Sequence, residues 1–331
     1  MTPPRVRRYS STRERGLALA YAVASREGDD DDDENDDDAQ RLTIVLTGGG
    51  VSGVDRTWAT ATRVADAARG RWRRGCAVLV WDRRNTGASG FSLGASGEPL
   101  PVQDADDLHD LITGLGLAPC VLVGQSSGAR VSAIVASRHP SAVRGLVLAP
   151  PTGGAAAAEA LCRMYYEEPK RWMLAGDARA VAAAWGMRDL AAVAALEACD
   201  RARFAAAMDA SSAWMRSFAR EAMLGLTDGA LAALVPRRRG PEPEGGDAES
   251  GARALIAGEE RDDDGGAARV AVAHSGDLTD TLHEAATAVR VATVVRAKQL
   301  HLVPGVFTPR AGERLAELAA LVGGAQRVAR L

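Results

Sequence analysis

The sequence predicts an α/β fold: a mostly parallel central sheet flanked by helices, with an inserted helical segment. The first observation is alternation, because short apolar runs and longer amphipathic stretches take turns from residue 43 to residue 149, as in βαβ units. The second is size: 331 residues, 47% of them hydrophobic, suffice for one large domain with an insertion. The third is that residues 155–234 show a helical pattern without strand-like runs.

The expected elements follow from the apolar runs and from the glycines and prolines that bound them. Strands are expected at residues 17–25, 41–46, 76–81, 120–123, 143–149, 253–257 and 289–295. Helices of the core are expected at residues 56–71, 102–115, 127–139 and 309–321. We expect the first two strands to pair as a hairpin around the acidic run at residues 29–38, which buries nothing because its like charges repel one another.

These patterns divide the chain into four segments. Residues 1–154 are the first part of the core, with a disordered acidic loop at 29–38. Residues 155–235 are an inserted helical cap, and residues 236–251 are a flexible linker rich in arginine, proline, glycine and glutamate. Residues 252–331 complete the core.

Composition argues against several kinds of partner. The formal net charge of −3 gives no reason to expect nucleic acid, and no apolar run approaches the roughly 20 residues of a membrane-spanning helix. The four cysteines are scattered without a Cys-x-x-Cys pair, which indicates core residues in a reducing compartment rather than disulfides or a metal site. A basic, serine-containing N-terminus is a feature of organelle targeting, but strand-like sequence follows almost at once, so a cytoplasmic location is expected.

The segment 120–130, Cys-Val-Leu-Val-Gly-Gln-Ser-Ser-Gly-Ala-Arg, is the most informative motif. It indicates an apolar strand, a Gly-x-Ser-x-Gly turn and the start of a helix, a context that exposes the serine hydroxyl above the strand end. Gly124 and Gly128 are needed because a side chain at either position would collide with the neighbouring strand or helix. We therefore predict Ser126 as a nucleophile and the backbone N–H of Ser127 as an oxyanion donor.

The other parts of such a site belong on loops that follow strands, because the carboxyl ends of parallel strands share one edge of the sheet. Residues 48–50, three glycines, follow the first parallel strand, and the N–H of Gly49 is the expected second oxyanion donor. His301 directly follows the expected last strand and is the predicted general base. The remaining histidines are excluded by their positions. His139 lies too far along the helix that follows Ser126, and His109 lies on a polar helix face. His274 and His283 precede the expected last strand.

The acid that orients the histidine is expected after the penultimate strand, in the loop 258–264. Three residues of this loop are candidates, with the first favoured: Asp262, Glu260 and Asp263. A second alignment makes residues 270–273 the penultimate strand and offers two other acids: Asp277 and Asp280.

These residues resemble the α/β-hydrolase superfamily, and the resemblance covers most of the chain. Besides the serine motif, residues 82–89, Asp-Arg-Arg-Asn-Thr-Gly-Ala-Ser, are similar to the family's Asp-x-Arg-Gly-x-Gly-x-Ser loop, and residues 139–148 to the helix end and strand that come next. The resemblance implies a Ser–acid–His hydrolase with a helical lid and with neither cofactor nor metal. Thr47 and Arg261 depart from the family pattern, standing where a histidine and the triad aspartate are usual.

We therefore expect hydrolysis of a carboxylic ester or related acyl bond in a small-molecule acyl substrate. Four large side chains of the cap are expected to bind the substrate in an apolar pocket: Tyr165, Tyr166, Trp185 and Trp214. One alternative is an aminopeptidase or amidase, with Glu167 or Glu168 binding the substrate amine. Another is a non-catalytic protein of this fold that binds a small ligand.

Overall fold

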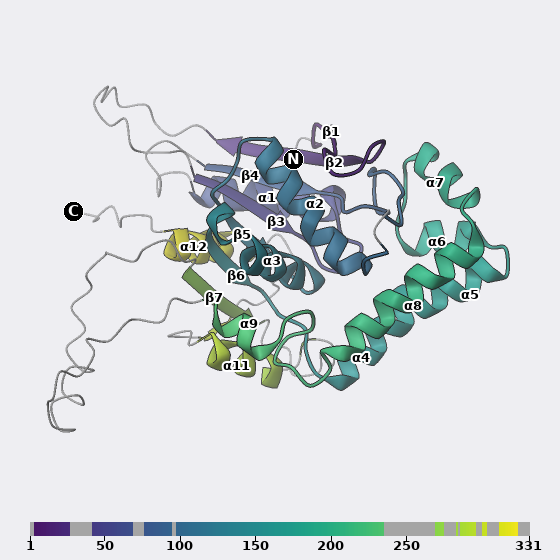
Figure 1. Cartoon of the computed structure of the whole chain (residues 1–331). Helices are drawn as coiled ribbons and strands as arrows, with labels where there is room; N and C mark the ends of the chain where they lie inside the picture. Colours follow the sequence, from purple (N-terminus) through teal and green to yellow (C-terminus); the bar gives the residue numbers. More distant parts are fainter. Residues whose placement is uncertain are drawn as a thin grey trace, which may run out of the picture.

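The described strands of the computed structural model form an eight-stranded sheet with helices on both faces (Figure 1). The structure describes residues 3–26, 42–68, 76–94, 97–234, 269–274, 283, 285–295, 300–302 and 311–323. The strands are β1 (Arg7–Ser10), β2 (Ala18–Arg26), β3 (Leu42–Thr47), β4 (Cys76–Trp81), β5 (Cys120–Gly124), β6 (Val143–Leu148), β7 (Arg269–His274) and β8 (Leu300–Leu302).

Strand order places the carboxyl ends of most strands along one edge. The order is β1-β2-β4-β3-β5-β6-β7-β8. The pairs β1–β2 and β2–β4 are antiparallel, and every pair from β4 to β8 is parallel. This common edge is where open α/β sheets bind their ligands, and it is the edge at which Ser126 follows β5.

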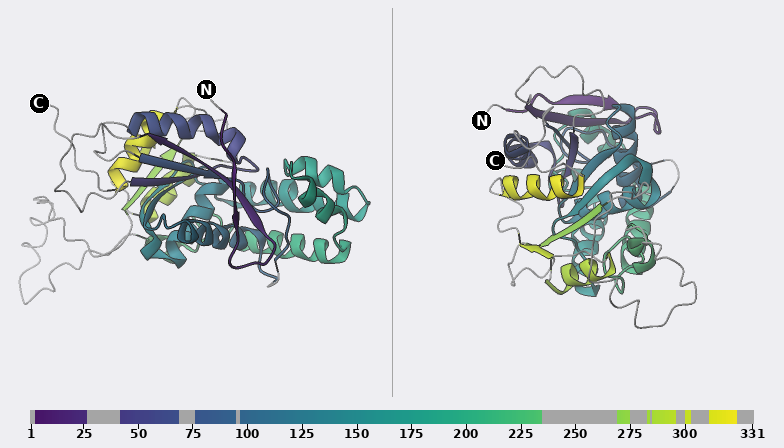
Figure 2. Two further views of the ribbon diagram at one scale, coloured as in Figure 1. Left: turned by 90° about the horizontal axis from the view of Figure 1, so that it is seen from above. Right: turned by 90° about the vertical axis from the view of Figure 1, so that its left-hand side faces the viewer.

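Helices cover both faces of the sheet and bury alternate residues of its strands. The helices are α1 (Val54–Ala68), α2 (Leu100–Gly114), α3 (Ser127–Arg138), α11 (Ala285–Val294) and α12 (Gly312–Gly323). Ile44 and Leu46 of β3 belong to the apolar cluster that includes residues of α1 and α12, whereas Val45 belongs to the cluster that includes residues of α2, α3 and α11. This follows from the two-residue period of a strand. Figure 2 shows α1 and α12 together on one side of the sheet.

Between β6 and β7 the chain inserts a group of helices, which we call the inserted helices. They are α4 (Ala155–Cys162), a π-helical turn (Arg163–Glu167), α5 (Glu168–Leu174), α6 (Ala178–Ala184), α7 (Leu190–Glu197), α8 (Arg201–Ser217) and α9 (Asp228–Ala232). Most of them extend away from the sheet at one end (Figure 1). They have their own apolar core, in which the rings of Trp185 and Phe204 stack with centroids 5.6 Å apart.

Short polar side chains define where several of these helices begin. Asp177, Asp189 and Asp200 each accept a backbone N–H from the first turn of α6, α7 and α8, which satisfies a donor that has no partner inside the helix. The domain boundaries inferred from the sequence stay predictions. Among the described residues, no helix is both long and apolar enough to span a membrane.

The expected pairing of the first two strands is wrong. β2 and β3 are not neighbours, because β4 lies between them and pairs antiparallel with β2 and parallel with β3. A parallel sheet with an antiparallel edge therefore replaces the expected hairpin. Three predicted segments lie outside the described residues: the acidic run 29–38, the linker 236–251 and the strand 253–257.

The strand expected at residues 289–295 is also wrong, because this segment belongs to α11 and the residue that follows it. Its β-branched residues favour a strand, yet its buried residues recur at intervals of three and four positions, as on one face of a helix. Ala288, Val291 and Val295 are buried, whereas Val289 is 52% exposed. The last strand is instead β8, and the strand before it is β7 at Arg269–His274, as in the second alignment of the sequence.

Candidate active site

Ser126 occupies a strained turn between β5 and α3. Its backbone has φ 55° and ψ −118°, a left-handed conformation that residues other than glycine adopt only at a cost of roughly 1–3 kcal/mol. The Ser126 N–H donates to Pro150 O at 3.0 Å, which ties the turn to the loop that follows β6. The hydroxyl is thereby presented at the carboxyl edge of the sheet.

The two motif glycines allow this turn to pack. A Cβ atom on Gly124 would lie 2.4 Å from Gly128 O and 2.5 Å from Ala129 Cα. A Cβ atom on Gly128 would lie 2.1 Å from Thr47 O. Both contacts are with backbone, which cannot move aside as a flexible side chain does. The steric reason for glycine predicted from the sequence is therefore present at both positions.

The loop after β3 lies directly against the serine. A Cβ atom on Gly49 would be 2.7 Å from Ser126 Cβ and 3.4 Å from Ser126 Oγ. Ser127, the next residue in the chain, is the first residue of α3, where a backbone N–H has no acceptor inside the helix. The structure thus brings both predicted oxyanion donors, Gly49 and Ser127, next to Ser126.

Gly49→Ala is expected to reduce ester hydrolysis by about 10²-fold or more, because the new methyl group must displace either the nucleophile or the loop that carries an oxyanion donor. The measurement is kcat/KM for p-nitrophenyl butyrate. Gly229→Ala is the matched control, since a Cβ atom there meets only Thr227 Oγ1, at 4.0 Å. Wild-type activity in the Gly49 variant would show that this loop does not contact the reacting groups.

His283 contacts the serine. Its Nε2 lies 2.7 Å from Ser126 Oγ, within hydrogen-bond distance, and the residue is 7% exposed. When Nε2 carries no proton, the serine hydroxyl donates to it, which is the arrangement of a nucleophile and its general base. The sequence pattern excluded His283, because this residue precedes the strand expected at residues 289–295.

The structure places His301 differently from the expectation. His301 lies within β8 and is in register with Ala273 of β7, so it does not follow the last strand as expected. The error came from the strand assignment rather than from the rule about loops. With β7 ending at His274, His283 is the histidine that follows a strand at the catalytic edge, and a correct β7 would have identified it.

The candidate acids all lie outside the described residues: Asp262, Glu260, Asp263, Asp277 and Asp280. Their order in the chain still separates them. Asp262 precedes β7, whereas Asp277 and Asp280 come after β7 and before His283. Among the described residues, no group of three His, Cys, Asp or Glu side chains could hold a metal ion.

The loop after β4 is fixed by its first residue, Asp82. The buried Asp82 carboxylate accepts the N–H of Val54 at 2.6 Å and of Ala88 at 2.7 Å, and so joins the start of α1 to the loop. Burial raises the pKa of Asp82, and these two N–H donors oppose the shift. A Cβ atom on Gly87 would collide with this carboxylate at 2.2 Å. These contacts of Asp82 therefore fix the loop at residues 82–89, which carries Arg83 and Arg84.

A cavity opens beside the serine between the core and the inserted helices. It is lined by Gly50, Val51, Arg83, Arg84, Asn85, Thr86, Leu100, Asp104, Ser127, Arg130, Tyr165, Tyr166 and Trp185. Three of the four predicted substrate-binding residues, Tyr165, Tyr166 and Trp185, are in its wall. Trp214 is not in this wall, and its ring packs on Phe218, with centroids 4.9 Å apart.

A parallel sheet with a strained serine at its carboxyl edge, contacted by a histidine, defines the class of α/β hydrolases. The chain belongs to this family, since the family model described as alpha/beta hydrolase fold matches residues 44–231.

Relatives agree with the family but differ in activity. A 76-residue stretch is 42% identical to the sn-1-specific diacylglycerol lipase ABHD11 of Mus musculus, and it covers 23% of this chain and 24% of that protein. The structure is similar to haloalkane dehalogenase DbeA from Bradyrhizobium elkani USDA94, with a TM-score of 0.56, 16% identity, and coverage of 97% of this chain and 99% of that one. It is also similar to a thermophilic esterase from Thermogutta terrifontis, with a TM-score of 0.50, 15% identity, and coverage of 95% and 96%. The structural likenesses establish the shared fold.

Proposed function

We propose that the protein is a serine hydrolase that cleaves a carboxylic ester or related acyl bond in a small-molecule substrate. The observation that carries this proposal is the 2.7 Å distance between Ser126 Oγ and His283 Nε2. A serine hydroxyl is a weak nucleophile unless a base accepts its proton as it attacks. A haloalkane dehalogenase or epoxide hydrolase of this fold uses an aspartate at this turn, so the serine disfavours both activities.

The mechanism follows from the placement of these groups. Ser126 Oγ attacks the acyl carbonyl carbon while His283 Nε2 takes the hydroxyl proton. The carbonyl oxygen becomes an oxyanion that accepts hydrogen bonds from the N–H groups of Gly49 and Ser127. His283 then gives its proton to the leaving alcohol, and the C–O bond breaks to leave an acyl-serine. A water molecule, deprotonated by His283, releases the carboxylic acid and restores Ser126.

The inserted helices act as a lid over this site in our proposal. Tyr165 and Tyr166 line the cavity, and a Cβ atom on Gly50 would lie 2.6 Å from Tyr165 Oη, which shows how closely the two parts approach. The partial identity with a diacylglycerol lipase supports ester hydrolysis over amide hydrolysis. Glu167, a candidate for binding a substrate amine, instead accepts a hydrogen bond from Arg216 at 2.5 Å.

Labelling by a fluorophosphonate tests the proposal, because this probe reacts only with an activated serine. We expect the wild-type protein to be labelled, the label to map to the peptide that contains Ser126, and Ser126→Ala to remain unlabelled. Ser132→Ala is a suitable control, since Ser132 is a buried serine of the same helix, α3. Unlabelled wild-type protein without activity on any p-nitrophenyl ester would favour the non-catalytic ligand-binding alternative.

A further inference from the structure

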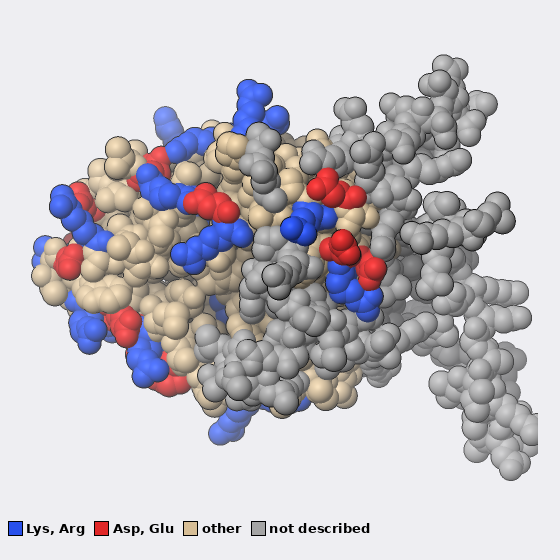
Figure 3. All heavy atoms as spheres, turned by 180° about the vertical axis from the view of Figure 1, so that it is seen from behind, with Lys and Arg blue, Asp and Glu red and all other residues tan. Residues whose placement is uncertain are grey.

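The cavity beside Ser126 is more basic than the sequence suggested. Its wall holds three arginines, Arg83, Arg84 and Arg130, together with one acid, Asp104. On the face of the molecule shown in Figure 3, basic and acidic side chains are interspersed at the surface. Inside the cavity the arginines are buried, at 8%, 6% and 5% exposure respectively. Buried charges need partners, so the partners of each arginine are informative.

Two of these arginines are paired with protein groups. The Arg84 guanidinium donates to both Asp107 carboxylate oxygens, at 2.7 and 2.6 Å. Burial raises the pKa of Asp107 to about 6, and Arg84 opposes that shift. Arg83 Nη1 donates to Ser127 Oγ at 3.2 Å and lies 3.6 Å from Asp104 Oδ2. Asp104 therefore offsets the charge of Arg83.

Arg130 differs from both. Its Nε has no hydrogen-bond partner, and its Nη1 donates to Met215 Sδ at 3.4 Å, a weak acceptor. Among the described residues, no carboxylate lies within the 4.0 Å of an ion pair with Arg130. Burial lowers the pKa of Arg130, but a guanidinium stays protonated in proteins. A buried cation with an unused donor thus faces the cavity, one helical turn from the nucleophile.

We infer that this cavity is a subsite for a carboxylate carried by the substrate, with Arg130 as its principal ligand and Arg83 as the second. The inference rests on the proposed function, since the substrate is the ester that Ser126 attacks. A guanidinium presents parallel N–H donors that match the two oxygens of a carboxylate. The cavity volume of about 70 Å³ admits a group of that size.

The position of the subsite sets where the carboxylate lies in the substrate. Arg83 reaches the side chain of Ser127, the residue after the nucleophile. The carboxylate therefore lies within a few bonds of the scissile carbonyl, as in a monoester of a short dicarboxylic acid. Tyr165 and Trp185 line the same cavity and would flank the chain between the two groups. This substrate class replaces the neutral acyl group that an apolar pocket would favour.

The wild-type protein gives the first test. The anionic substrate is mono-p-nitrophenyl glutarate, and its neutral counterpart of equal carbon number is p-nitrophenyl pentanoate. We expect kcat/KM for the glutarate monoester to be about tenfold higher or more, the effect of one charge-assisted pair. Glutarate should also inhibit pentanoate hydrolysis competitively, and glutaramide should not. Equal kcat/KM for the two esters overturns the inference, as does inhibition by inorganic phosphate but not by glutarate.

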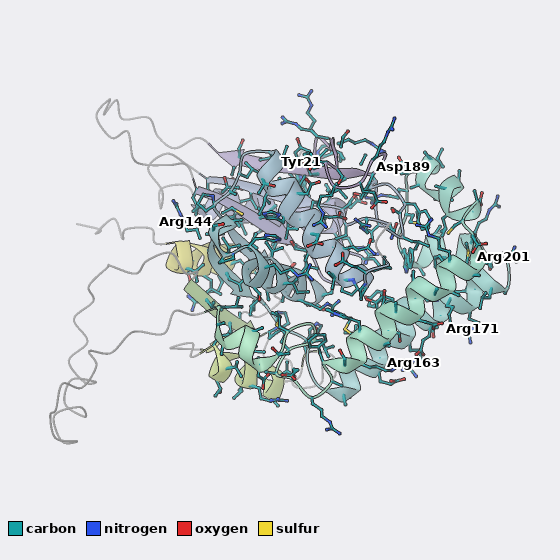
Figure 4. The ribbon with its side chains drawn as sticks, viewed as in Figure 1. Tyr21, Arg144, Arg163, Arg171, Asp189 and Arg201 are labelled. Atoms are coloured by element: carbon teal, nitrogen blue, oxygen red, sulfur yellow. The ribbon has the colours of Figure 1, made fainter. Side chains whose placement is uncertain are left out.

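Variants of Arg130 identify the ligand. The quantity measured is the ratio of the two kcat/KM values, because general damage to a buried position lowers both. Arg130→Met should reduce the ratio about tenfold or more, and Arg130→Lys should retain part of it. Arg171→Met is the matched control: it removes the same charge from an exposed position on the outer side of α5 (Figure 4) and should leave the ratio unchanged. An unchanged ratio in folded Arg130→Met overturns the inference, and if that variant does not fold, the wild-type comparison decides.

The outcomes separate this inference from the proposed function. If Ser126 is labelled but the anionic ester is not preferred, the carboxylate subsite is overturned and the serine-hydrolase function is supported. An unlabelled Ser126 with neither ester cleaved removes the hydrolase, and the subsite is then decided by saturation-transfer NMR of glutarate against glutaramide. Signal for glutarate alone supports the subsite, and equal or absent signals overturn it.

Discussion

His283→Ala is expected to lower kcat/KM for p-nitrophenyl butyrate by about 10⁴- to 10⁶-fold, as loss of the general base does in serine hydrolases. The reason is the 2.7 Å contact between its Nε2 and Ser126 Oγ. Without it, the serine must attack with its proton still bound, and the leaving alkoxide has no proton donor. Fluorophosphonate labelling of Ser126 should fall in parallel.

His301→Ala is the matched control for this prediction. His301 lies within β8, in register with Ala273, and should stay within a few-fold of wild type in the same assays. Because His283 is buried, circular dichroism and melting temperature of both variants establish that they are folded, and His283→Gln offers a less disruptive change. Should His301→Ala abolish turnover while His283→Ala remains active, the assignment of the base would be wrong.

The first half of the core was predictable because its strands are short apolar runs bounded by glycine, proline or charge. The expected strand at 76–81 has the bounds of β4, and the expected strand at 120–123 differs from β5 by one residue. The turn at Ser126 followed from that strand and the next helix. The nearness of Gly49 and Ser127 to Ser126 could be predicted from the same pattern, since loops after parallel strands meet at one edge.

The second half could not be predicted as well, because β-branched residues serve both strands and buried helix faces. Residues 289–295 contain four valines and one threonine, and only packing against the sheet shows that they belong to a helix. That single error shifted the expected last strand, and the expected strand led to His301 rather than to His283, which contacts Ser126. The rule about loops was sound, but it was applied to the wrong strand.

The charged lining of the cavity also depends on tertiary structure. Arg83 comes from the loop after β4, Arg130 from α3, Asp104 from α2 and Tyr166 from the inserted helices. An arginine in a sequence is usually a surface residue, and nothing local distinguishes Arg130 from Arg138 on the same helix, which is 43% exposed as a side chain. Only the structure shows that Arg130 is buried without an ion-pair partner among the described residues, whereas Arg138 is exposed and pairs with Asp106.

The proposed mechanism needs an acid that orients His283, and we expect this acid to follow β7, in the order Ser–acid–His along the chain. Asp277 and Asp280 satisfy this order, whereas Asp262 precedes β7. Asp280 is the favoured residue, because the three residue steps from Asp280 to His283 span at most roughly 10 Å.

Asp280→Asn is therefore expected to lower kcat by about 10⁴-fold, the effect of amidating a triad aspartate, since the amide stabilises the wrong imidazole tautomer. KM should change little, because this carboxylate acts through His283 and does not contact the substrate. The measurement is steady-state kinetics on p-nitrophenyl butyrate, with Asp277→Asn and Asp262→Asn alongside. A loss confined to Asp277→Asn would move the acid within the same loop. A loss confined to Asp262→Asn would show that the acid reaches His283 from a segment before β7, against the chain order on which this prediction depends.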